Sequence, residues 1–222
     1  APTGQLPATA VELFASEAPR HGERAAGLAL EIQNLLPPAS VPTYTQLWVA
    51  GALAAGQDGP RVLDLLRAVA VADAPNGPAF ELAERVLEQT RDSANMDALL
   101  LVALQHASTD SARSALTRRR IALLEAQSRF TESLPLHAQL TVELEPADVP
   151  ARAAARRAHA ERGTPDERAR FLARLSRRLQ GDDGIDVVRE LLDVRMSIDD
   201  QIGAEAAARD LLERKPGDAR AL

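Results

Sequence analysis

The chain has 222 residues, of which 45% are hydrophobic and only 3% aromatic, and its formal net charge at pH 7 is -6. This length is sufficient for one large domain or two small ones with a buried core. The chain has no cysteine, which excludes disulfides, thiolate metal sites and a cysteine nucleophile. The acidic balance disfavours a generic nucleic-acid binder, which normally carries a basic surplus.

Apolar residues recur at helical spacing along almost the whole chain, and no stretch shows sustained alternation with β-branched enrichment. Two wide apolar stripes lie at 62–70 and 80–87, each suited to bury one face of a helix. Further along, Thr164 precedes Pro165 and two acidic residues, a pattern typical of a capped helix start. The sequence therefore predicts an all-α protein.

Helix breakers divide the chain at regular intervals. The residues that follow expected helix ends are 37, 33, 38, 35 and 35 residues apart, and they are Pro38, Pro75, Ser108, Pro146, Gly181 and Pro216. Each interval has room for two helices, and a period of this length is typical of a solenoid in which neighbouring hairpins cover one another's apolar faces. We therefore expect one helical-repeat domain over 1–222, with about six antiparallel hairpins at 8–38, 43–75, 76–108, 110–146, 147–181 and 182–216.

The segment LLERKPGDARAL, from Leu211 to Leu222, resembles the end of one tetratricopeptide repeat and the beginning of the next. Small and apolar residues match the family pattern in this repeat and in two earlier segments, at Val188, Leu191, Ala204, Ala208, Leu211 and Pro216, at Ala169 and Ala173, and at Leu47, Ala50 and Gly51 running to Pro75. Three residues depart from the pattern, Arg156, Leu192 and Arg195. A more general right-handed α-solenoid is the alternative.

The resemblance implies a right-handed superhelix with a concave groove lined by the first helices of the repeats. It also implies a non-catalytic scaffold that binds a partner protein or peptide in that groove, and we expect the chain to be an excerpt of a longer array. The alternative is a helical regulatory or small-ligand-sensing module of a larger signalling protein, in which a pocket between hairpins would matter more than the groove.

Four candidate partner-binding residues follow from the repeat register that the resemblance implies. Trp48 and Phe80 would occupy a first-helix position that faces the groove, where a large aromatic residue could anchor a partner. The alternative is a buried aromatic contact between neighbouring helices. Arg189 and Asp193 would face the groove in the repeat at 182–216.

Arginines are concentrated between 151 and 178. This stretch contains nine arginines but only three acidic residues. Arg170, Arg174 and Arg177 are spaced i, i+4 and i+7, which places them on one helical stripe. This stripe is a candidate docking patch for an acidic protein surface or for phosphates. The alternative is an exposed face paired with nearby acids, in a chain whose arginine bias reflects a GC-rich bacterial genome. Nucleic acid is disfavoured because no aromatic residues are interleaved for base stacking.

No sequence pattern supports catalysis or metal binding. The four histidines, His21, His106, His137 and His159, are far apart, and we expect surface or capping roles for them. The run Gly181–Asp186 has several acids but lacks the length and the closing glutamate of a calcium loop, so it is predicted to be a turn. We therefore expect no enzyme activity, no cofactor and no metal.

Burial and compartment can be predicted only in part. Leu100, Leu123 and Leu191 are expected to be buried anchors of the core. The longest strongly apolar run, 98–104, is far shorter than the roughly 20 residues that span a bilayer, so no membrane span is expected. A cytoplasmic location is slightly favoured, and the oligomeric state is left open.

Overall fold

The computed structural model describes residues 70–71 and 74–221. Within these residues the structure has eight α-helices with defined bounds, one short π-helix and no strand. The predicted all-helical class is thus confirmed for this part of the chain. None of the described helices is long and apolar enough to cross a membrane.

The chain divides into two compact units, Ala1–Ala112 and Arg113–Leu222. In the first unit, α5 (Pro78–Thr90) packs against α6 (Ser93–His106). Arg91 ends α5 in a left-handed conformation, with φ at 53°. The carboxylate of Asp92 then caps α6 by accepting a hydrogen bond from the backbone N–H of Asn95 at 3.1 Å.

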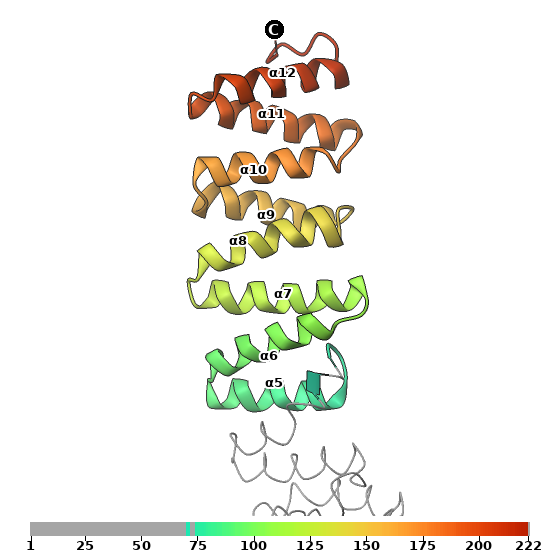
Figure 1. Ribbon diagram of the computed structural model, residues 1–222, viewed down its shortest axis with the longest axis vertical. Helices are drawn as coiled ribbons and strands as arrows, with labels where there is room; N and C mark the ends of the chain where they lie inside the picture. The colour runs from blue at the N-terminus through green and yellow to red at the C-terminus, as the bar shows by residue number, and fades with distance from the viewer. Residues whose placement is uncertain (1–69, 72–73, 222) are drawn as a thin grey trace, which may run out of the picture. The chain divides into compact units, whose positions relative to one another are not determined.

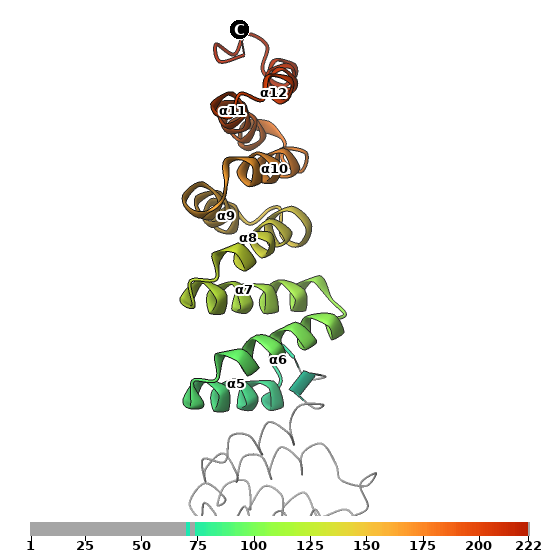
Figure 2. The same cartoon turned by 60° about the vertical axis from the view of Figure 1, so that its left-hand side comes forward.

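The second unit contains the remaining helices. They are α7 (Asp110–Ala126), of which the first three residues precede the boundary, α8 (Phe130–Gln139), the π-helix η2 (Leu140–Leu144), α9 (Val149–Arg162), α10 (Pro165–Ser176), α11 (Gly181–Ser197) and α12 (Gln201–Arg214). From α8 onward, each helix contacts the next one in the chain. Figures 1 and 2 show α8 to α12 lying beside one another in chain order.

Local capping chemistry sets several of these helix starts. Thr164 accepts a hydrogen bond from the backbone N–H of Glu167 at 3.2 Å, and the Glu167 carboxylate accepts one from the Thr164 N–H at 2.8 Å. This capping box begins α10 where the sequence predicts a helix start. Asp148 and Asp200 cap α9 and α12 without the reciprocal bond, because each accepts one hydrogen bond from a backbone N–H, that of Ala151 and that of Gly203.

One buried cluster of the second unit consists of aliphatic side chains with a single phenylalanine. Its buried members are Ala138, Val142, Ala155, Ala169, Phe171, Leu172, Leu175, Leu179, Val187, Val188, Leu191, Leu192, Val194, Ala207 and Leu211. The alanines among them leave room for neighbouring helices to pack closely. Because so few aromatic residues are available, many small contacts replace a few large ones.

Two of the three predicted anchors are confirmed. Leu100 and Leu191 are buried, with exposed fractions of 1% and 7%. Leu123 is only half-buried, whereas its neighbour Leu124 is fully buried. Leu123 and Leu124 are adjacent, and the spacing of apolar residues in the sequence does not decide which of the two lies on the buried face of the helix.

The turn predicted at Gly181–Asp186 is wrong, because these residues form the beginning of α11. Asp182 and Asp183 lie in the first helical turn, where carboxylates are stabilised by the helix dipole. Gly184 permits a close approach, since a Cβ there would lie 2.7 Å from the carbonyl oxygen of Leu179. The glycine thus serves packing, and the chain changes direction earlier, after α10 ends at Ser176.

Candidate functional site

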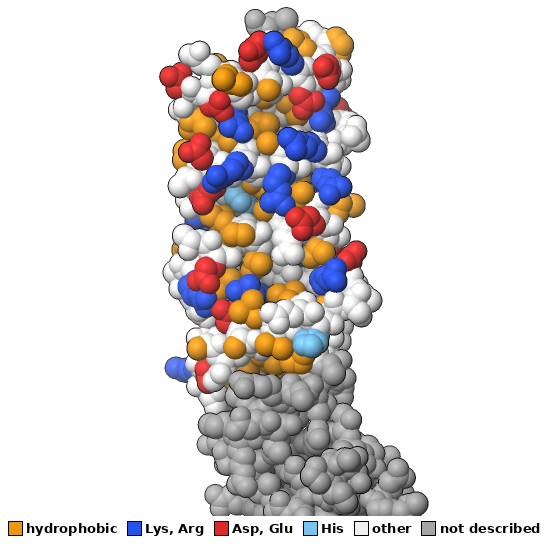
Figure 3. Space-filling view, viewed as in Figure 1, with side chains coloured by type: hydrophobic (Ala, Val, Ile, Leu, Met, Phe, Trp, Pro, Cys, Tyr) orange, Lys and Arg blue, Asp and Glu red, His pale blue; other side chains and the backbone are white. Residues whose placement is uncertain are grey.

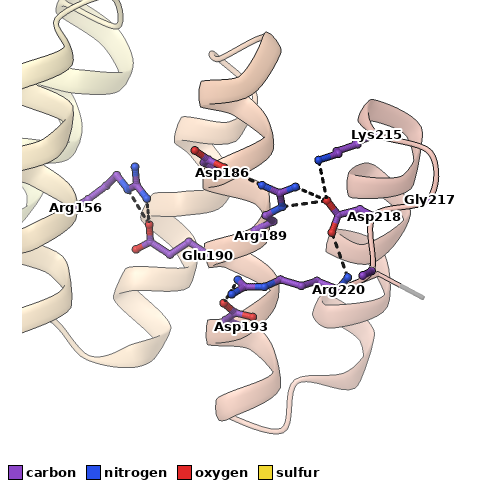
Figure 4. Close-up of a pocket in the computed structure, with 10 residues that line it drawn as sticks. Arg156, Asp186, Arg189, Glu190, Asp193, Lys215, Gly217, Asp218 and Arg220 are labelled. Atoms are coloured by element: carbon purple, nitrogen blue, oxygen red, sulfur yellow. Dashed lines mark hydrogen bonds and ion pairs between the residues drawn. The ribbon is translucent and has the colours of Figure 1, made fainter.

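A charged depression of about 730 Å³ lies on the surface of the second unit and is called the charged hollow below. It lies between α9, α11 and the residues after α12, as Figure 4 shows. The lining residues are Arg156, Asp186, Arg189, Glu190, Asp193, Lys215, Gly217, Asp218, Ala219 and Arg220. Cationic and anionic side chains are equal in number among them.

Helix α11 supplies one wall of this hollow. Its four lining residues are Asp186, Arg189, Glu190 and Asp193, which are spaced i, i+3, i+4 and i+7. This spacing places them on a single helical face. The apolar residues between them, Val187, Val188, Leu191 and Leu192, are buried in the core. The amphipathic pattern of α11 therefore turns the charged stripe towards the hollow.

The opposite wall is the segment Lys215–Ala221, which follows α12 and is called the post-α12 segment below. Gly217 has φ at 82°, in the left-handed region that favours glycine. The backbone N–H of Asp218 donates to the carbonyl of Lys215 at 3.2 Å, and that of Ala221 donates to the carbonyl of Asp218 at 3.1 Å. These turns bring the Asp218 side chain back towards α11.

Arg189 and Asp218 form the central ion pair of the hollow. The Nε of Arg189 donates to Asp218 Oδ2 at 3.0 Å, and its Nη2 donates to the same oxygen. Its Nη1 donates to Asp186 at 3.0 Å. The Arg189 guanidinium holds the pKa of the Asp218 carboxyl below its usual value, and the hydrogen bond to Asp218 raises the pKa of Arg189. Both groups are thus charged at neutral pH.

Glu190 of α11 forms ion pairs with two arginines, Arg156 and Arg168. It accepts hydrogen bonds from Arg156 Nε at 2.7 Å and from Arg168 Nη2 at 2.8 Å. Only 15% of the Glu190 side chain is exposed. One carboxylate therefore serves two guanidinium groups, which leaves a local surplus of one positive charge beside Arg156.

The rim of the hollow is more exposed. Arg220 Nη1 donates to Asp193 Oδ2 at 2.7 Å, and the two side chains are 58% and 56% exposed. The Lys215 ammonium lies 3.9 Å from Asp218 Oδ2. Because exposed ion pairs are weak, these rim contacts can exchange for contacts with a bound molecule at little cost.

The structure brings two of the predicted site residues into this hollow, Arg189 and Asp193. Trp48 lies outside the described residues. Phe80 is fully buried, with an exposed fraction of 0%, so it presents no surface to a partner and occupies the position of a core side chain. Sequence reasoning missed Asp218 and Arg220, because their approach to α11 depends on contacts between residues almost 30 positions apart.

The predicted arginine stripe lies on and just after α10. Arg170, Arg174 and Arg177 are all exposed, and Arg177 is the C-cap residue that follows α10. Arg174 pairs with Glu143 at 2.6 Å, and none of the three lines the charged hollow. Figure 3 shows acidic and basic side chains interspersed on the visible face of the second unit.

Two of the three described histidines are buried, which corrects the expectation of surface or capping roles for them, and His21 lies outside the described residues. His137 and His159 are 7% and 4% exposed. His159 stacks on Phe171, with ring centroids 4.1 Å apart, and its Nδ1 donates to the Ala155 carbonyl at 2.9 Å. Burial lowers the pKa of His159. His137 contacts Glu125 at 3.0 Å.

Other features of the described residues offer less to a ligand. A smaller apolar hollow of about 200 Å³ lies beside α5 and α6, lined by Val71, Ala83, Leu87, Asn95, Ala98, Leu99 and Val102. Its volume is below the roughly 300–1,000 Å³ of typical small-molecule sites. No group of side chains suited to hold a metal ion occurs in the described ranges.

No known protein-family profile matches the sequence, and no curated protein matches it significantly.

Proposed function

We propose that this chain is a non-catalytic, helical-repeat scaffold of the tetratricopeptide type that binds a partner protein or peptide in the charged hollow beside α11. The observation that carries the proposal is the convergence of Arg156, Arg189, Asp193 and the post-α12 segment on one open depression. Arg189 and Asp193 are also the residues that the repeat register turns towards a groove.

The chemistry of the hollow favours a peptide over an apolar small molecule. Small-molecule sites are mostly apolar with a few polar groups, whereas this lining is dominated by charged side chains. Exposed rim pairs such as Arg220 with Asp193 offer charged groups to a polar chain. Complementary charges of this kind give specificity and speed association more than they add affinity.

The order of the helices supports the scaffold architecture. From residue 76 onward, two α-helices coincide with each expected hairpin interval to within one residue, and from α8 onward each helix contacts its neighbour in the chain. Such nearest-neighbour packing is typical of repeat proteins. We infer a right-handed solenoid from this order and from the resemblance together.

A displayed random-peptide library tests the proposal. Peptides selected on the 222-residue chain are expected to bind a double variant, Arg156→Gln with Asp193→Asn, at least about tenfold more weakly, a loss of roughly 1.4 kcal/mol. Arg209→Gln is the matched control, because Arg209 forms an exposed pair with Glu205 on α12 that does not line the hollow.

Two outcomes would contradict the proposal. One is that the library yields no peptide that binds the folded chain. The other is that the selected peptides tolerate the double variant but are lost with Arg170→Gln, Arg174→Gln and Arg177→Gln combined. The second result would move the binding site to the arginine stripe of α10.

A further inference from the structure

Three arginine–aspartate ion pairs recur along the second unit. They are Arg118–Asp148, Arg152–Asp183 and Arg189–Asp218. In the first two pairs, an arginine of α7 or α9 reaches an aspartate near the start of the next α-helix but one, α9 or α11. The three aspartates follow one another at intervals of 35 residues. The pairing thus repeats with the period of the expected hairpins, and the third pair, shown in Figure 4, continues it beyond α12.

Asp218 also has the backbone environment of a helix start. Its side chain accepts a hydrogen bond from the backbone N–H of Arg220 at 3.2 Å, and its carbonyl accepts one from the N–H of Ala221 at 3.1 Å. The side chain of Asp148, which caps α9, likewise accepts the backbone N–H of Ala151. The post-α12 segment therefore lies at the place in the repeat where α9 and α11 begin.

Helix α12 leaves uncovered a strip that α10 buries. α10 packs against both α9 and α11, whereas among the described helices α12 packs mainly against α11. When the N-cap residues of the two helices are aligned, Leu172 and Ser176 of α10 correspond to Ala208 and Leu212 of α12. Leu172 and Ser176 are 0% and 3% exposed, but Ala208 and Leu212 are only half-buried. The strip at Ala208 and Leu212 is thus the face on which a second neighbour of α12 would pack.

We propose that this strip of α12, together with Arg189, is a docking surface for a further helical hairpin that is continuous with the post-α12 segment. The first helix of that hairpin begins at Asp218 and covers Ala208 and Leu212. The Arg189–Asp218 pair fixes its start to α11. The contact continues an interface that the chain already forms, since α11 packs against α10 and pairs through Asp183 with α9. Such nearest-neighbour interfaces stabilise helical repeats.

A chimera with one added hairpin tests this surface. In it, residues 183–222 are repeated directly after Gly217, so that the copied Asp183 takes the place of Asp218 and copies of α11 and α12 follow. The chimera is expected to gain helical circular dichroism in proportion to the two added helices. Its urea unfolding should show no additional transition, and its midpoint should be higher than that of the unchanged chain, because the copy buries the strip on α12.

Leu212→Arg at the original position is the variant that breaks the proposed contact. In the unchanged chain this half-buried residue should tolerate the substitution with a small shift of the urea midpoint. In the chimera the same substitution should remove the gain in midpoint, because a charged side chain would be buried between α12 and the copy. Ala206→Arg is the matched control, since Ala206 and its α10 counterpart Arg170 are both exposed, and it should leave the gain intact.

Two results would overturn the inference. One is a chimera whose added residues contribute no helicity or unfold in a separate transition. The other is an effect of Leu212→Arg that is equal in the chimera and in the unchanged chain. A second chimera, in which residues 148–182 follow Gly217, covers the case in which the first does not fold. Absence of added helicity in both chimeras would also overturn the inference.

These measurements report helicity and stability, and none of them requires a peptide ligand. The inference therefore goes beyond the proposed function, and each can fail without the other. A chimera without a docked hairpin leaves peptide binding in the charged hollow in place. A library without peptides that depend on the hollow leaves the docking surface of α12 in place.

Discussion

Leu123 and Leu124 are neighbours in α7 that differ in burial. Leu124 is fully buried and Leu123 is half-buried. Truncation of a buried leucine removes its transfer free energy and leaves a cavity. We therefore expect Leu124→Ala to lower the free energy of unfolding by about 2–5 kcal/mol, and Leu123→Ala to lower it by less than half as much. Urea unfolding followed by circular dichroism measures both, and equal losses would contradict the assigned face of α7.

Asp218 influences both the charge and the local backbone structure of the hollow. Its carboxylate satisfies Arg189 and accepts the backbone N–H of Arg220, so it both neutralises the hollow and fixes the turn of the post-α12 segment. A buried carboxylate without a cationic partner would be costly. The pairing with Arg189 thus explains how the Asp218 side chain can be buried while charged.

At the scale of the element, the capping box of α10 supports a prediction of its own. Thr164→Ala removes the acceptor of the Glu167 N–H and should lower the free energy of unfolding by roughly 1 kcal/mol. Thr164→Ser retains the hydroxyl and should restore most of this loss. Thr131→Ala, at an exposed position inside α8, is the control and should be nearly neutral. The measurement is the urea midpoint, and a Thr164→Ala midpoint equal to that of Thr131→Ala would contradict the role of the cap.

Elements whose boundaries depend on local chemistry could be predicted from the sequence. The start of α10 follows from Thr164, Pro165 and the acids after them, because a cap acts within one helical turn. The start of α11 could not be predicted in the same way. Gly184 reads as a breaker, but it is a packing residue, because a Cβ there would clash with the backbone carbonyl of Leu179 and with the Arg214 side chain of α12.

The candidate site of the molecule could be predicted only on its α11 side. Arg189 and Asp193 follow from repeat register, which depends on spacing within one helix. Arg156 and Asp218 reach the hollow from other parts of the chain, and local patterns carry no information about such long-range pairings. The buried histidines were missed for the same reason, since the stacking of His159 on Phe171 joins two helices.

The stability of the whole molecule should depend on pH in two windows. Hydrogen bonds hold the pKa of five carboxylates, Asp92, Asp148, Glu167, Asp200 and Asp218, below their ordinary values of 3.8 for aspartate and 4.5 for glutamate. The stability that these carboxylates contribute is present above those ordinary values and is lost as the pH falls further. His159 adds a separate window at higher pH.

Burial lowers the pKa of His159 below its ordinary value of 6.5, with smaller effects from His137, which lowers it, and from Glu167, which raises it. Below pH 6.5 the unfolded chain takes up a proton that the folded chain binds less readily, so the free energy of unfolding should fall as the pH is lowered. Urea midpoints measured from pH 8 to pH 5 should show this fall. His159→Gln removes the titrating group and should flatten the profile, whereas His106→Gln, at an exposed position, should leave it unchanged. An identical slope in His159→Gln and the unchanged chain would assign the pH dependence to other groups.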